Sequence, residues 1–160
     1  ITDDLLKVVE IFEAHNSEID SDIIRDENLE SNKILAIVRP DLESIGYKVE
    51  KGKKKEEKIQ VPVLFGKNGS LEMYFEADAY HSKNRTVIEV EAGRGVTNNQ
   101  FLKDLFQACM MHNVSFLVIA VKNIYRQSQK DFEKVTTFFN SLYASRRLIL
   151  PLEGVLIIGY

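Results

Sequence analysis

The hydrophobic residues at the start of this chain have a helical spacing. Thr2 suits an N-cap, and the apolar face of the helix that follows is made by Leu5, Val8, Val9 and Phe12. A second helix is expected over about residues 23–38. Pro40 interrupts it, and one further turn ends at Gly46. The chain therefore opens with two helices.

The middle of the chain changes to a period of two, which is typical of strands. Strands are expected over residues 59–65, 71–80 and 86–91, with a turn at 67–69. A helix around Phe101–Cys109, an apolar strand, another helix and a last strand follow; the two strands span residues 114–121 and 155–158. This order predicts an α/β fold with a mixed β-sheet flanked by α-helices.

Composition limits the class of protein further. The chain has 160 residues, of which 44% are hydrophobic, and this length fits one domain. No apolar run approaches the roughly 20 residues of a membrane span, so no membrane association is expected. The single cysteine, Cys109, excludes an internal disulfide and favours a cytoplasmic location. One cysteine and three scattered histidines do not make a usual structural zinc site.

The candidate chemistry lies in the hairpin over residues 71–91. If Lys83 and Asn84 form its tip, Asp78 lies opposite Glu89, and Glu76 lies opposite Glu91. Opposed like charges destabilise a hairpin, and a bound divalent cation such as Mg²⁺ would remove the repulsion. The alternative is a solvated acidic face. The apolar neighbours of Glu89 and Glu91 favour a central strand, and therefore the metal site.

Two polar segments are candidate contacts for nucleic-acid phosphates. The first follows the acidic strand and contains Arg94 between two glycines, then Asn98. The second is a lysine-rich run that includes Lys53, Lys54 and Lys55. This run is either a basic loop that binds phosphates or a solvated hairpin tip, and the residues alone leave both interpretations open.

The order of these features resembles the PD-(D/E)xK nuclease superfamily. An aspartate on one strand is followed by an apolar strand with Glu-x-Glu, then by a helix and a buried strand. The pattern is similar to type II restriction endonucleases with a Glu-x-Glu variant of the motif. The resemblance implies that Asp78 and Glu89 bind Mg²⁺, with Mn²⁺ as an alternative, and that Glu91 stands at the position of the motif lysine. It implies DNA as the substrate and one nuclease-like domain, with N-terminal helices over 1–40 and a sheet-containing core over 41–160. Because a DNA duplex has two strands, a homodimer would suit this substrate.

The chain departs from the family pattern at the lysine of the motif. Lys103, on a polar helix stripe with Gln107, is a candidate to reach the site instead. The family also tends to place an acid from its first helix near the metal, and Glu30 and Glu43 are both candidates for it. Without the lysine, the alternative function is a catalytically inactive module that binds nucleic acid or a protein partner.

The formal net charge of −3 does not argue against a DNA substrate, because the charge is unevenly distributed. Residues 1–30 hold ten acids and two bases, whereas the remaining 130 residues hold 19 bases and 14 acids. An acidic N-terminal segment is therefore attached to a basic body.

Overall fold

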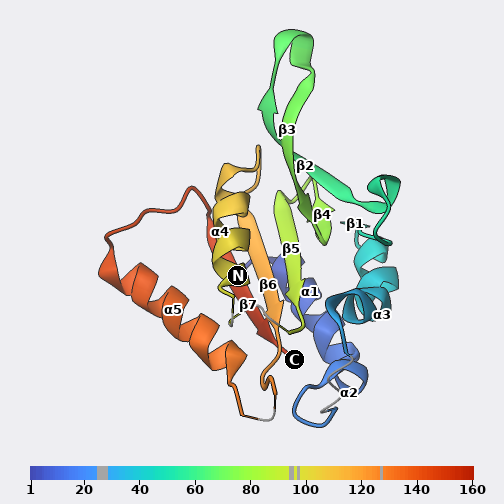
Figure 1. Ribbon diagram of the computed structural model, residues 1–160, viewed down its shortest axis with the longest axis vertical. Coiled ribbons are helices and arrows are strands. Elements are labelled where there is room, and N and C mark those ends of the chain that lie inside the picture. Colours follow the sequence, from blue (N-terminus) through green and yellow to red (C-terminus); the bar gives the residue numbers. More distant parts are fainter. Residues whose placement is uncertain (25–28, 94–95, 97, 127) are drawn as a thin grey trace.

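The computed structural model describes residues 1–24, 29–93, 96, 98–126 and 128–160 (Figure 1). Its helices are α1 (Asp3–Ala14), α2 (Asn16–Ile19), α3 (Ser31–Ser44), α4 (Gln100–Met110) and α5 (Asp131–Ser145), with 3₁₀ turns η1 (Lys55–Glu57) and η2 (Lys67–Gly69). Its strands are β1 (Lys48–Val49), β2 (Ile59–Phe65), β3 (Leu71–Ala77), β4 (Ala79–His81), β5 (Thr86–Glu91), β6 (Phe116–Val121) and β7 (Gly154–Gly159). Among the described residues, no helix has the length and hydrophobicity that crossing a bilayer requires.

The predicted mixed sheet is confirmed. In the described part of the chain, five strands pair in the order β1-β4-β5-β6-β7. β1, β4 and β5 are antiparallel neighbours, whereas β5, β6 and β7 run parallel. β2 and β3 form a separate two-stranded sheet, which extends away from the body at the top of Figure 1. The protein is therefore an α/β fold.

Helices cover both faces of the main sheet. One core packs α1 and α3 against Ile88 and Val90 of β5. The other packs α4 and α5 against Val87 on the opposite face of the same strand. Because side chains alternate along a strand, Glu89 and Glu91 share the face of Val87 and point toward the α4 layer.

The N-terminal helices differ in part from the prediction. The Thr2 side chain caps α1 by accepting a hydrogen bond from the Leu5 amide at 3.4 Å, as expected. The second long helix, α3, begins at Ser31 rather than near residue 23, and it continues through Pro40 to Ser44. Burial explains the continuity, because Val38 and Leu42 on either side of the proline are fully buried in one core. The predicted boundary at residue 40, between the N-terminal helices and the sheet-containing core, therefore falls inside α3.

Gly46 ends the α3 segment, as the sequence predicts. Its φ of +100° is a left-handed conformation that glycine adopts without strain. A Cβ at this position would lie 2.7 Å from Nε2 of His81. The backbone can therefore turn closely past β4 and enter β1.

The expected long strand over 71–80 is divided at Asp78. β3 pairs with β2, with Glu76 opposite Gln60, whereas β4 joins the main sheet with Ala79 opposite Ile88. The predicted pairing of Glu76 with Glu91 is therefore wrong, because β3 leaves the main sheet before that pair could form. The predicted register of the hairpin itself is confirmed from residue 79 to its tip.

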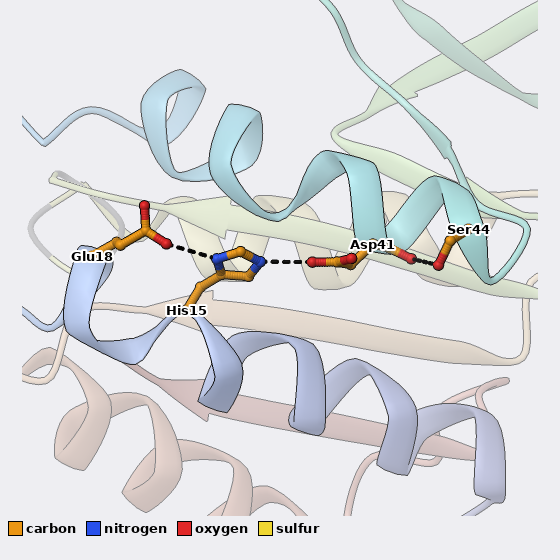
Figure 2. A network of polar contacts seen from close by, with 4 residues as sticks. All are labelled: His15, Glu18, Asp41 and Ser44. Carbon is orange, nitrogen blue, oxygen red and sulfur yellow. Dashed lines mark hydrogen bonds and ion pairs between the residues drawn. The ribbon is translucent and has the colours of Figure 1, made fainter.

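His15 connects the end of α1 to α3 (Figure 2). Its Nδ1 lies 2.9 Å from a Glu18 carboxylate oxygen, and its Nε2 lies 2.7 Å from Oδ2 of Asp41. The hydrogen bonds to Glu18 and then Asp41 raise the pKa of His15. The Ser44 hydroxyl donates to the Asp41 backbone carbonyl and makes no contact with the ring, so these residues are not a Ser-His-Asp triad.

Replacing His15 by glutamine is expected to destabilise the protein only at low pH. A histidine whose pKa is raised on folding contributes stability that is full below its unfolded pKa of about 6.5 and disappears as the pH rises through the raised folded value. The free energy of unfolding in urea is expected to fall by up to about 1 kcal/mol at pH 5.5 and to change little at pH 9. An equal loss at both pH values would contradict the charged bridge.

Candidate functional site

Asp78 lies at the break between β3 and β4, and it is next to Glu89 of β5. The Asp78 side chain replaces a strand hydrogen bond that the break removes, because its Oδ2 accepts the Val90 amide at 2.7 Å. Burial is the main reason that the pKa of Asp78 rises to about 6, and the Val90 hydrogen bond opposes it. Burial, then the charges of Asp78 and Asp104, raise the pKa of Glu89 well above its ordinary value. The two acids are therefore a mutually repelling pair.

Asp104 of α4 adds a carboxylate to this pair. It lies on the apolar stripe of the helix, between Phe101 and Leu105, and its exposed fraction is 3%. Its Oδ2 is buried and accepts no hydrogen bond as long as the neighbouring Glu91 carboxyl is ionised, and its Oδ1 lies 3.4 Å from Nζ of Lys103. A buried carboxylate oxygen without a donor indicates that a cation or a proton would stabilise this position.

Glu91 lies next to Asp104 at the end of β5. Burial, then the charge of Asp104 and a hydrogen bond with it, raise the pKa of Glu91 to about 8. Glu91 also borders a cavity of about 440 Å³, which is lined in addition by Leu29, Glu30, Ser31, Asn32, Ala92, Gly93 and Tyr125. The cavity lies at the carboxyl ends of parallel strands, where α/β sheets commonly bind ligands.

Glu50 adds a fifth acid on the other side of Asp78. Together we call these residues the row of acids: Glu50, Asp78, Glu89, Glu91 and Asp104. Glu50 follows β1 directly, its amide donates to the Asp78 carbonyl at 2.8 Å, and its exposed fraction is 6%. The Lys58 ammonium pairs with Oε1 of Glu50 at 2.8 Å and with Oε2 of Glu76 at 3.8 Å. Glu50, Asp78 and Glu89 thus come from three neighbouring segments of the sheet.

The supporting residues predicted from the sequence fall in different places. Glu30 borders the same cavity as Glu91, whereas Glu43 is exposed and pairs with Lys51 at 3.5 Å. Lys103 lies beside Asp104, and its positive charge opposes the raised pKa values of Glu89 and Glu91. Gln107 is half-buried one turn further along α4.

The predicted phosphate contacts are exposed. Lys53, Lys54 and Lys55 lie in the segment that leads into η1 and β2, and Asn98 lies in a turn before α4. Lys55 borders an open groove together with Lys58, so this part of the lysine run comes close to the row of acids. Arg94 lies outside the described residues.

The donor types of the site fit Mg²⁺, but their arrangement is not a closed metal cage. Carboxylate oxygens are the preferred ligands of hard divalent cations, and the unpartnered Oδ2 of Asp104 supplies a free one. In the part of the chain that the structure describes, no three or more His, Cys, Asp or Glu side chains are already arranged to hold a metal ion. Metal binding would therefore require some of these side chains to rotate.

Sequence reasoning missed Asp104, Glu50 and Lys58. A signal existed for Asp104, because a charged residue interrupts the apolar stripe of its helix at helical spacing from Phe101 and Ala108. Glu50 and Lys58 had no local signal. They meet Asp78 only because β1 pairs with β4 and β2 pairs with β3.

Comparison of the chain with protein-family models, with curated proteins and with solved structures found no match.

Proposed function

We propose that this protein is a Mg²⁺-dependent endonuclease with a restriction-endonuclease-like fold, which hydrolyses phosphodiester bonds in DNA. The observation that carries the proposal is the gathering of Asp78, Glu89, Glu91 and Asp104 in a partly buried position at the end of β5. Folding would not favour so many repelling acids in one place without a ligand that neutralises them.

Asp78 and Glu89 are the proposed metal ligands, with Mn²⁺ as a substitute for Mg²⁺. When bound, the ion would polarise the scissile phosphate and lower the pKa of the attacking water. Asp78 is well placed for this role because its second carboxylate oxygen is fixed by the Val90 amide, which sets the direction of the side chain.

Glu91 is the proposed base that accepts a proton from the attacking water. A pKa of about 8 gives this carboxyl group an affinity for protons that suits general-base chemistry near neutral pH. Its position on the wall of the cavity gives it access to solvent. Lys103, next to Asp104, supplies positive charge near the same carboxylates.

DNA is the proposed partner because the site combines acids for a cation with nearby basic residues. Lys53, Lys54 and Lys55 are exposed in the segment before β2 and are free to follow a phosphate backbone. A homodimer would present two such sites to the two strands of a duplex. The single cysteine supports a cytoplasmic location for this reaction.

Two observations favour a second candidate function. The described residues hold no group already arranged around a metal ion, and β5 carries Glu91 where the motif has lysine. Both features suit a catalytically inactive module that keeps the fold and binds nucleic acid or a protein partner. Such a module would bind DNA equally well with and without a divalent cation.

The experiment that separates the two candidates is cleavage of supercoiled plasmid and of single-stranded DNA in Mg²⁺, in Mn²⁺ and in EDTA. The nuclease proposal predicts nicked or linear product only with a divalent cation. DNA binding without product under any of these conditions would favour the inactive module.

A further inference from the structure

Among the described residues, Lys58 is a less exposed cation beside the acids than Lys103. The exposed fraction of its side chain is 22%, compared with 55% for Lys103. Its ammonium is held at 2.8 Å by Glu50, a carboxylate that is itself 93% buried. A lysine fixed in this way loses little conformational entropy when it binds a further group.

Lys58 also lines an open groove on the surface of the protein. Lys55, Glu56, Lys58 and Gln60 line this groove, whose volume is about 420 Å³. The two lysines and the amide of Gln60 outnumber the one carboxylate, Glu56, so the groove suits an anionic oxygen. Lys58 provides three donors, of which Glu50 at 2.8 Å and the more distant Glu76 at 3.8 Å engage at most two. The charge of Lys58 reaches Asp78, because it opposes the raised pKa of that residue. The groove and the row of acids therefore meet at one side chain.

We propose that Lys58 is a catalytic residue of this site, whose ammonium binds an oxygen of the DNA phosphate from the groove while Glu50 holds it beside Asp78. This inference rests on the proposed nuclease function and deepens it, because it assigns to β2 a positive charge that β5 lacks. A cation fixed before the substrate arrives stabilises the negative charge that develops on the phosphate without reorganising.

The test must separate this role from simple pairing with Glu50. Removing Lys58 alone leaves a buried, unpaired carboxylate, which can unfold the protein. The informative variant is therefore Lys58→Met combined with Glu50→Gln, compared with Glu50→Gln alone. Lys58→Arg keeps the charge, and Lys83→Met, at the distant tip of the β4–β5 hairpin, is the matched control. Single-turnover cleavage of a DNA duplex and the Kd for Mn²⁺ alone are measured for each.

The double variant is expected to cleave about 10²-fold more slowly than Glu50→Gln, whereas its Kd for Mn²⁺ stays equal or falls, because a positive charge beside the acids is gone. Lys58→Arg is expected to recover part of the rate, and Lys83→Met to match wild type. Equal cleavage by the double variant and Glu50→Gln would overturn the role of Lys58 while leaving the nuclease proposal intact. A wild-type protein that neither cleaves DNA nor binds Mn²⁺ would overturn both.

Discussion

Replacing Asp78 by asparagine, or Glu89 by glutamine, is expected to lower the rate of DNA cleavage by about 10³-fold or more. Each change keeps the shape of the side chain but removes a negative charge that the proposed metal ion requires. Because each change also relieves repulsion among buried carboxylates, the melting temperature without metal should stay the same or rise. Plasmid nicking in Mg²⁺ and Mn²⁺ measures the first effect, and thermal unfolding in EDTA measures the second.

The matched control for these variants is Glu72→Gln, because Glu72 is an exposed acid of β3. It should cleave at the wild-type rate. Activity that is unchanged in both Asp78→Asn and Glu89→Gln would show that catalysis occurs elsewhere.

The second large effect is expected in the pH dependence of stability. Glu91 has a folded pKa of about 8 against an ordinary value of 4.5, and Asp78 has about 6 against 3.8. An acid whose pKa is raised on folding is ionised in the unfolded chain before it is ionised in the folded one. The metal-free protein should therefore lose stability as the pH rises from about 4 to about 8. Glu91 alone corresponds to about 5 kcal/mol at about 1.4 kcal/mol per pKa unit, so the melting temperature is expected to fall by at least roughly 10 °C at about 2–4 °C per kcal/mol.

Two comparisons isolate the contribution of the acids. Glu91→Gln should flatten the decline, while the contribution of His15, which is shared by both proteins, cancels in the difference. Mg²⁺ or Mn²⁺ should raise the melting temperature more at pH 8 than at pH 5, because only ionised carboxylates bind a cation. A decline of the same size in Glu91→Gln would mean that this carboxyl is not the group that titrates.

The sequence predicts that Asp78 and Glu89 lie close together, because the geometry that joins them is local. The turn at Lys83 and Asn84 fixes which residues of β4 and β5 face one another, and the same register brings Asp78 next to Glu89. Alternation along β5 then places Glu91 on the face of Glu89. The mixed α/β sheet follows from the change of period along the chain in the same way.

The edges of the site could not be predicted because they depend on pairing between distant segments. The strand over residues 71–80 shows one continuous alternation, yet it divides at Asp78 because β2 pairs with its first part. That division moves Glu76 away from Glu91 and brings Lys58 to the acids. Glu50, rather than Glu30 or Glu43, lies beside Asp78 because β1 pairs with β4. The local sequence of these two short strands does not predict that pairing.

The central claim is that Asp78 and Glu89 bind a divalent cation, and crystals grown with Mn²⁺ test it most directly. We expect an anomalous difference peak within coordination distance of one oxygen from each of these two carboxylates, and no peak there in Asp78→Asn. A protein that crystallises with both carboxylates ordered, and with Mn²⁺ bound elsewhere or not at all at saturating concentration, would contradict it.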